Sequence, residues 1–266
     1  MAKLEWDKTG ERFVENGVSK GVLYPQASDG TYPKGVAWNG LTAVNESPDG
    51  ADPNDLYADN IKYGSLRGAE TFGYSISAYT FPDEWNACDG SAALAEGVYI
   101  GQQKRQAFGF CWRTEISNDT ASEGDDGYKI HIAYGSTATP SDKSWETIND
   151  SPDAQEFEWE CDTNPVPVTG HKPTATLVID TRKVDAAKLA LIEDALYGTA
   201  DADPHLLLPD EVYDIIRATY TEASPVAGDN PKTNGWYEKV GNAYVKSTDT
   251  TVDDSKTYYV KSYTNP

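Results

Sequence analysis

The stretch Glu156-Phe157-Glu158-Trp159-Glu160-Cys161 alternates carboxylates with apolar side chains at every position. Because successive side chains of an extended strand point to opposite faces, it predicts a strand with an acidic row on one face and an apolar row on the other. Glutamates two positions apart on a strand are about 7 Å from each other and repel by roughly half a kcal/mol per pair in water. An acidic surface kept against this repulsion suggests that its charge has a function.

The acidic bias extends over most of the chain, which carries 43 acidic and 22 basic residues and a formal net charge of -21. From residue 229 onward there are five acidic residues and five lysines, so residues 1–228 carry the whole negative charge. Such a surface repels phosphates and offers few of the lysines and arginines that bind a nucleic-acid backbone. The composition therefore argues against a nucleic-acid binder, although nucleic acid could still slide past this surface.

The residue composition favours a mainly β protein. Its 17 tyrosines and 7 tryptophans prefer strands, and glycine and proline are spread through all 266 residues. This length suits one large β domain with a small appendage. The first 13 residues lack the apolar core of a secretion signal, and no stretch has the roughly 18 apolar residues of a membrane span. We therefore expect a cytosolic protein with no membrane partner.

Four further stretches show the alternation of strands that have one polar and one apolar face. They cover residues 71–81, 108–115, 128–134 and 174–181. Two flanking helices are expected among the strands. One covers residues 183–197, with Asp180 and Thr181 as cap candidates, and ends at Gly198. The other begins at Pro209, and acidic residues follow in its first turn, where they suit the helix dipole.

Residues 36–66 are expected to form a projecting arm. Asn39-Gly40, flanked by apolar residues, is typical of a two-residue hairpin turn in which both residues have positive φ. Residues 45–55 are rich in Pro, Gly, Asp and Asn, which predicts a long acidic loop. The candidate contact residues of the arm are Trp38, Asn39, Gly40, Leu41, Asp49, Asp52 and Asp55.

The chain is expected to contain a main domain over residues 1–222 and a small C-terminal β module over residues 235–266. Residues 223–234 read as a linker by composition. The module has three similar short strands that begin near Trp236, Ala243 and Tyr258. Three short strands are marginally stable alone, so the module is expected to pack on a neighbour or to use its aromatic residues densely.

We expect no catalytic residue, metal site or cofactor site. The sequence contains no HExxH, GxSxG, Walker or GxGxxG motif. Its three cysteines are widely spaced, so we expect them to be reduced and to serve as packing residues. His131 is expected on the polar face of a strand. Asp83-Glu84 beside Trp85 allows an alternative, an acidic glycosidase or carbohydrate-binding module. In that alternative, the glycan-binding residues are Trp85, Trp112 and Trp159.

Several blocks of sequence, in order over most of residues 13–213, resemble the major tail proteins of long, non-contractile-tailed phages. The blocks are residues 17–25 (GVSKGVLYP), 35–48 (GVAWNGLTAVNESP), 56–63 (LYADNIKY), 78–84 (AYTFPDE), 88–90 (CDG), 101–105 (GQQKR), 148–152 (INDSP), 170–176 (GHKPTAT), 183–188 (KVDAAK) and 208–211 (LPDE). The C-terminal module departs from the shortest members of that family and looks like an appended surface domain. The resemblance carries over no catalytic residue.

The resemblance implies a tail-tube subunit with a mainly β sandwich or barrel fold and flanking helices. Such subunits assemble as hexameric rings that stack into a conduit for DNA, so the chain's main partner is itself. The other implied partners are the tail terminator, distal tail and tape-measure proteins, with assembly in the host bacterial cytoplasm and a final location in the virion tail. Under this hypothesis Glu156, Glu158 and Glu160 line the lumen and residues 36–66 contact the next ring. A bacterial secretion-tube homologue is a third alternative.

Overall fold

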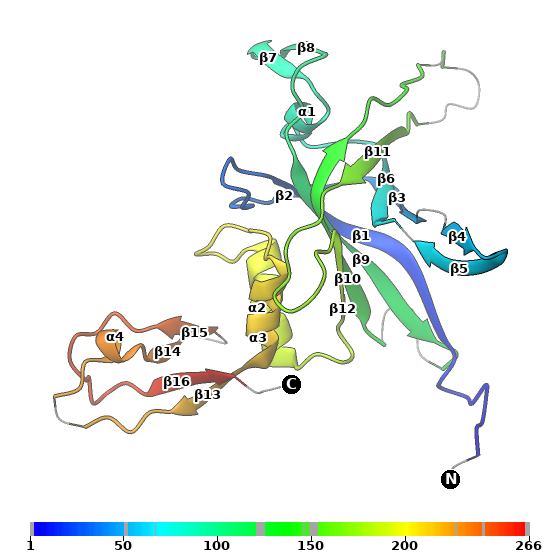
Figure 1. The fold of residues 1–266 in the computed structure, drawn as a ribbon. Helices are drawn as coiled ribbons and strands as arrows, with labels where there is room; N and C mark the ends of the chain where they lie inside the picture. Colours follow the sequence, from blue (N-terminus) through cyan, green and yellow to red (C-terminus); the bar gives the residue numbers. More distant parts are fainter. Residues whose placement is uncertain are drawn as a thin grey trace.

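The computed structural model of the protein describes residues 3–50, 53–66, 68–120, 126–145, 147–148, 154–226, 228–240 and 243–263. The fold is mainly β, as predicted, and is built around one strongly curled antiparallel sheet (Figure 1). The strand order is β2-β1-β9-β10-β11-β6-β3, and β12 also pairs with β10. The strands are β1 (Phe13–Pro25), β2 (Val36–Trp38), β3 (Leu41–Gly50), β6 (Glu70–Ala78), β9 (Phe108–Asn118), β10 (Tyr128–Ala138), β11 (Phe157–Thr163) and β12 (Thr176–Asp180).

The sheet forks along β10. Residues 129–133 of β10 pair with β12, whereas residues 136–138 pair with β11. Gly135 lies between the two sections with φ of +58°, and its carbonyl accepts a hydrogen bond from the amide of Asn164 at 3.0 Å. The fork turns β11, β6 and β3 over the β1-β9-β10 section, so that one continuous sheet forms the two layers of a sandwich.

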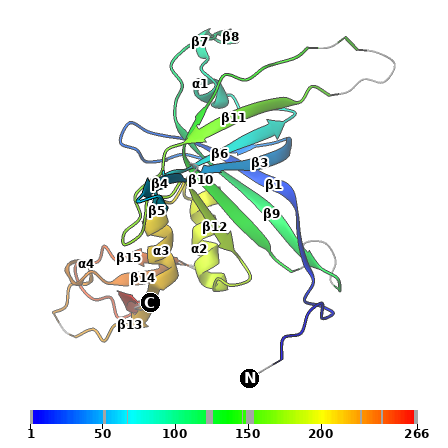
Figure 2. The same cartoon turned by 45° about the vertical axis from the view of Figure 1, so that its right-hand side comes forward.

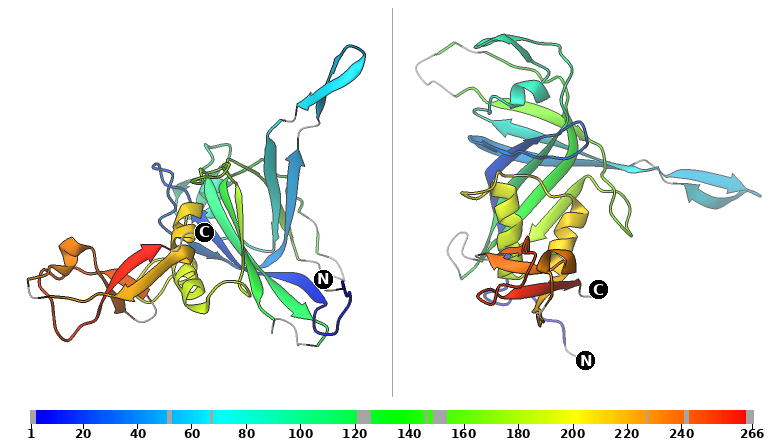
Figure 3. Two further views of the ribbon diagram at one scale, coloured as in Figure 1. Left: turned by 60° about the horizontal axis from the view of Figure 1, so that its bottom comes forward. Right: turned by 90° about the vertical axis from the view of Figure 1, so that its left-hand side faces the viewer.

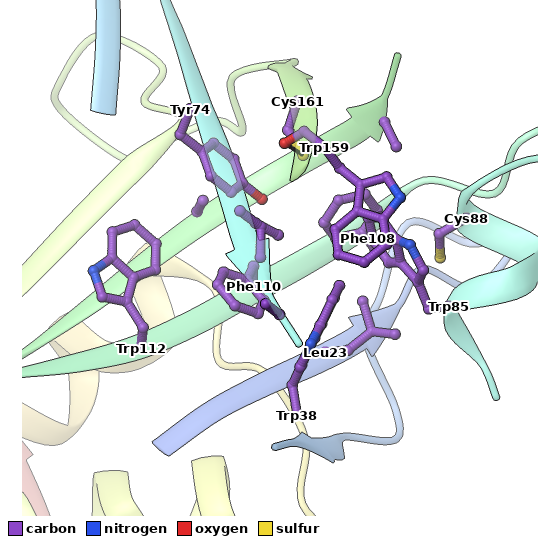
Figure 4. Close-up of a cluster of buried hydrophobic side chains, with 14 residues drawn as sticks. Leu23, Trp38, Tyr74, Trp85, Cys88, Phe108, Phe110, Trp112, Trp159 and Cys161 are labelled. Atoms are coloured by element: carbon purple, nitrogen blue, oxygen red, sulfur yellow. Dashed lines mark hydrogen bonds between the residues drawn. The ribbon is translucent and has the colours of Figure 1, made fainter. Parts of the chain in front are cut away.

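A first core fills the space between these two layers (Figure 4). Trp159 of β11 is fully buried there, with its ring centroid 5.3 Å from that of Trp85 and 5.5 Å from that of Trp38. Phe110 of β9 faces Tyr74 of β6 across the same space, 6.2 Å between ring centroids. Aromatic rings at these separations combine a large buried area with favourable edge and offset-stacked geometry.

A second core lies on the other side of β1, β9, β10 and β12, where the two long helices pack (Figures 1 and 2). These helices are α2 (Ala186–Tyr197) and α3 (Pro209–Arg217). The buried hydroxyl of Tyr24 donates to the carbonyl of Leu196 at 2.6 Å, and that of Tyr134 donates to the carbonyl of Leu207 at 3.0 Å. These bonds tie the sheet to the helix layer and satisfy hydroxyls that burial would otherwise penalise.

Both helices form where the sequence predicts them, with one difference at a cap. The N-cap of α2 is Asp185, which accepts from the amides of Ala187 and Lys188, and not the expected Asp180 or Thr181. Residue 180 still belongs to β12, because Asp180 pairs with Lys129 of β10. The α3 helix begins at Pro209, and the Glu211 side chain accepts from the amide of Leu208 at 2.7 Å.

The expectation of one polar face per strand is wrong for β9 and β10. Residues 108–112 are all buried, and so are residues 130–136. The first core covers one face of these strands and the helices cover the other. His131, which was expected on a solvent-exposed strand face, is only 9% exposed, so that prediction is wrong as well.

A projecting hairpin lies within residues 36–66, and its tight turn is not at Asn39-Gly40. β2 pairs with β1 and β3 pairs with β6, so these two residues connect two strands that do not pair with each other. The tight turn is Asp59-Asn60, whose φ values of 50° and 63° fit a type I′ turn. It joins β4 (Asn54–Ala58) to β5 (Ile61–Leu66), and this hairpin extends the β3-β6 pair away from the body (Figure 3). Most of the predicted acidic loop 45–55 is therefore strand.

A short helix, a hairpin and a small C-terminal sheet complete the fold. The helix is α1 (Trp85–Cys88), and the hairpin of β7 (Ala92–Ala95) and β8 (Val98–Ile100) follows it. At the C-terminal end, a four-stranded sheet has the order β13-β16-β14-β15. Its elements are β13 (Ala218–Glu222), α4 (Pro231–Asn234), β14 (Tyr237–Val240), β15 (Ala243–Lys246) and β16 (Tyr258–Tyr263). Because β13 pairs with β16, the small sheet begins directly after α3, earlier than the linker expected over 223–234.

Replacing Gly135 by alanine should destabilise the protein strongly, because its Cβ would lie 2.3 Å from the carbonyl oxygen of Asn164. Gly170→Ala is a matched control: its φ is +78°, but a Cβ there meets nothing within 4 Å. We expect a loss of about 1–2 kcal/mol in unfolding free energy for G170A from backbone strain alone. G135A should lose about 1–3 kcal/mol more. Denaturant unfolding measures both, and equal losses would show that the fork does not depend on this close approach.

Candidate functional site

The outer face of β11 carries the acidic row that the sequence predicts. Glu156, Glu158 and Glu160 are exposed, whereas Trp159 and Cys161 are buried in the first core. The hydroxyl of Thr42 donates to the Glu156 carboxylate. The alternation therefore places the carboxylates on one side of the strand and anchors the strand from the other.

This surface continues across the neighbouring strands. Glu158 pairs with Ser77 of β6, and Glu160 pairs with Ser75, which in turn pairs with Asn45 of β3. Directly paired residues share one side of a sheet. We call this surface the acidic face. It consists of the exposed Glu156, which precedes β11 in the same alternation, and of the paired positions Ala43, Asn45, Ser47, Asp49, Thr71, Gly73, Ser75, Ser77, Glu158, Glu160 and Asp162.

The negative charge of the acidic face is not balanced by basic side chains on the face itself. The face holds five carboxylates, and none of its twelve positions is a lysine or an arginine. The described residues contain no group of three or more His, Cys, Asp or Glu side chains arranged to hold a metal ion. The face therefore repels phosphate oxygens, and this repulsion weakens as salt screens it.

The acidic face and the helices lie on opposite sides of the molecule. Going through the fold from the acidic face, the order is the β3-β6-β11 layer, the first core, the β1-β9-β10 layer, the second core and the α2-α3 layer. Trp159 lies in the first core and Val22 lies in the second core. One side of the protein is thus a charged sheet face, and the opposite side is covered by helices.

The tip of the arm exposes an unusual number of large apolar side chains. Leu56, Tyr57, Ile61, Tyr63 and Leu66 are 41–77% exposed on a single two-stranded hairpin. The hairpin closes at the Asp59-Asn60 turn, and Lys62 forms an ion pair with Asp55 at 2.7 Å across it. Exposed apolar patches of this kind mark protein interaction sites.

The arm residues chosen from the sequence lie in three places. Asp49 and Asp55 are on the arm, Asp52 lies outside the described residues, and the remaining four, Trp38, Asn39, Gly40 and Leu41, are at its root. Trp38 is buried in the first core, where its indole N–H donates to the carbonyl of Thr80 at 2.8 Å. The apolar tip residues were missed, although Asp59-Asn60 between apolar residues was a hairpin signal.

The sheet ends in strands that have one unpaired edge. The two terminal strands of the main sheet are β2 and β3, and in the described chain β3 pairs only with β6. Among the described residues, β1 pairs with β2 over residues 21–23 alone. The outer edge of β1 is therefore open at residues 13–20. Open edges of this length can pair with another chain.

The three tryptophans of the carbohydrate alternative cannot serve as glycan platforms. Trp85 and Trp159 are fully buried and Trp112 is 3% exposed. Asp83 and Glu84 lie in the turn that starts α1, where the amide of Asn86 donates to the carbonyl of Asp83. They border an open groove of about 760 Å³, whose other charged side chains are Lys104 and Arg105. No helix among the described residues is both long and apolar enough to span a membrane.

The acidic face, the apolar arm tip and the open strand edges are features of a structural protein. The family model described as "Phage tail tube protein" matches residues 12–199, and the chain belongs to this family. The family is a structural one and not an enzyme family, so the chain is a structural component of the phage tail. The resemblance seen in the sequence is thereby confirmed.

A comparison with solved structures found similarity to a sheath/tube terminator of an extracellular contractile injection system, determined by cryo-EM in the extended state. The identity is 10% and the TM-score is 0.29, over 66% of this chain and 99% of the other. The comparison with curated proteins gave no match.

Neighbouring residues of β11 should respond very differently to substitution. Glu158→Lys changes an exposed side chain, so we expect the unfolding free energy to change by no more than about 0.5 kcal/mol. Trp159→Ala removes a fully buried indole and should cost about 3–5 kcal/mol. Thermal or denaturant unfolding of the two variants tests this. A large loss for E158K would mean that the acidic row stabilises the fold itself.

Proposed function

We propose that the chain is the repeating subunit of the tail tube, that six copies form a ring, and that rings stack into a conduit through which DNA leaves the virion. The observation that carries this proposal is the acidic face: a three-stranded surface with five carboxylates and no basic residue, in a chain of the tail tube family. In the proposed tube this face lines the lumen.

The geometry of a closed barrel is compatible with this assignment. Four strands per subunit, namely β3, β6, β11 and the end of β10, give about 24 strands in a ring of six. At about 4.8 Å between strands and about 40° tilt, the barrel is about 48 Å across at the backbone. Side chains narrow the bore to about 40 Å, which admits a duplex about 20 Å wide together with water and ions.

The sign of the charge matters for transport. A lysine or arginine facing the duplex forms a phosphate contact that releases counterions and adds salt-dependent affinity, and each such contact slows passage. Glu156, Glu158 and Glu160 repel phosphates instead, so the DNA passes without specific binding. The strand that carries these carboxylates needs a rigid support to keep its position in the tube wall. The buried Trp159, packed in the first core, provides this support.

The other surfaces fit the remaining contacts of a tube. The open edges of β1 and β3 can be satisfied by adjacent subunits around the ring. The apolar arm tip contacts the next ring. The C-terminal sheet follows α3 directly, and α3 lies on the side opposite the acidic face, so this sheet decorates the outside of the tube. The tail terminator, distal tail and tape-measure proteins are the proposed partners at the ends and inside, and the host cytoplasm is the site of assembly.

Cryo-EM of tubes formed by the purified protein tests the lumen assignment. We expect six-fold rings with Glu158 and Glu160 on the inner wall and the β13-β16-β14-β15 sheet at the outer radius. In parallel, tubes of the Glu158→Lys, Glu160→Lys double variant should retain linear duplex DNA at 50 mM salt and lose it at 200 mM, because the new phosphate contacts are salt-dependent. Carboxylates found on the outer wall would refute the assignment.

Substitution of two arm-tip tyrosines tests the inter-ring contact. Tyr57 and Tyr63 are 71% and 77% exposed, so Tyr57→Ser with Tyr63→Ser should leave the subunit folded and yet abolish or severely reduce tube elongation. Tyr213→Ser on α3, where the tyrosine is 47% exposed, is the matched control and should elongate normally. Sedimentation and negative-stain microscopy report tube length. Normal tubes from the arm variant would exclude the arm from the contact.

A further inference from the structure

One buried titratable group lies where the root of the arm crosses the body of the subunit. His131 of β10 is 9% exposed, and its ring stacks on that of Trp112 at 5.2 Å between centroids and 10° between planes. Trp112 stacks in turn on Tyr74 of β6, the strand that pairs with β3. The imidazole is therefore held in place by packing on both layers of the sandwich.

The charged groups that face His131 come from three strands. Glu15 of β1 places Oε1 3.3 Å from Nε2, and Glu46 of β3 places Oε1 3.6 Å from Nδ1. Lys129, on β10 with His131, forms an ion pair with Glu15. Glu46 belongs to the strand that leads into the arm, so its contact with His131 joins the arm to the body.

The hydrogen bonds assign the protons of the imidazole. The hydroxyl of Thr114 donates to Glu15 Oε1 at 2.6 Å, so its oxygen accepts from Nε2 of His131 at 2.9 Å. In the neutral ring Nε2 then carries the proton and Nδ1 has only a lone pair. Nδ1 is buried, makes no hydrogen bond and faces a carboxylate oxygen, which is also an acceptor. One proton is missing from this contact.

Burial lowers the pKa of His131, while Glu46 and Glu15 act to raise it and Lys129 to lower it. The net direction is down, so the ring is neutral at pH 7.5 and gains its second proton only at a lower pH than an ordinary histidine does. Burial would raise the pKa of Glu15, but hydrogen bonds from Lys129 and Thr114 lower it overall, and this carboxylate stays ionised. His131 thus gains a positive charge when the solution is acidified, beside a Glu15 carboxylate whose pKa is lowered.

We propose that His131 and Glu46 form a proton-operated latch between the arm strand β3 and the β1-β9-β10 layer. At neutral pH the Nδ1 lone pair and the Glu46 carboxylate repel each other, and the latch is open. When Nδ1 binds a proton, its N–H donates to Glu46 Oε1, and a charge-assisted hydrogen bond closes the latch. The root of the arm is then held more firmly against the body.

The latch follows from the geometry of one subunit, but its consequence for assembly rests on the proposed tube function. If the arm tip contacts the next ring, a closed latch restricts the directions in which the arm can point. Tubes should then elongate with a dependence on pH that disappears when Glu46 is changed.

Hydrogen exchange of the full chain followed by mass spectrometry tests the latch at pH 7.5 and pH 5.0, with rates corrected for intrinsic exchange. The variant is Glu46→Gln, at a side chain that is 44% exposed. At pH 7.5 its amide N–H can donate to the bare Nδ1, so β3 peptides should be protected more in E46Q than in the wild type, by about fivefold for one net hydrogen bond. At pH 5.0 the order should reverse, since the wild type then has the stronger, charged bond.

Two controls separate this effect from general changes. Glu160→Gln removes a carboxylate of the acidic face and should keep the wild-type response of β3 to pH. Exchange at the histidine C2 position reports the pKa of each imidazole, and E46Q should lower that of His131 and leave His171 and His205 unchanged. The same order of protection at both pH values, or an unaltered His131 titration in E46Q, overturns the latch. A confirmed latch with pH-independent elongation instead contradicts the proposed role of the arm.

Discussion

The packing of Trp159 against Trp38 and Trp85 is the constraint on which the rest of the molecule depends. These indoles meet under the strand that carries the acidic row, with 4.7–5.5 Å between ring centroids. Carboxylates two residues apart repel one another, and a strand held only by backbone hydrogen bonds could twist to separate them. The buried rings fix the strand in one orientation, so the energy of the core maintains a surface that is unfavourable by itself.

The same core explains why one sheet can serve two purposes. At Gly135 the sheet forks, and the β3-β6-β11 section folds over the β1-β9-β10 section. The inner section is covered on both faces and supplies stability. The outer section is covered on one face only, which leaves its other face free for charge and its edge free for pairing. A charged surface and a rigid support are thus built from adjacent strands.

The sequence predicts the elements whose pattern is local. The alternation around Trp159, the helix that begins at Pro209 and the helix that ends at Gly198 depend on neighbouring residues, and all three are found. Burial of β9 and β10 on both faces was not predicted, because it depends on helices far along the chain covering Cys111 and Ile132. Local sequence shows which positions are apolar but not how many layers a strand will contact.

The arm shows the same limit in a different form. Asn39-Gly40 has the composition of a tight hairpin turn. However, β2 pairs with β1 and β3 pairs with β6, so the two strands on either side of Asn39-Gly40 do not form a hairpin. Tertiary pairing overrides the turn preference there. At Asp59-Asn60 no other strand competes, so the local preference decides.

The position of His131 follows from the fork as well. Only because β3 is carried over the β10 layer does Glu46, a residue of the arm strand, reach an imidazole whose other nitrogen is bonded to the body. A sheet without the fork would leave Glu46 in solvent and His131 on a wet strand face, as the local pattern predicts for it. The curvature that separates the acidic face from the helices therefore also places a titratable contact between the arm and the body. The single buried histidine among the described residues lies at that junction.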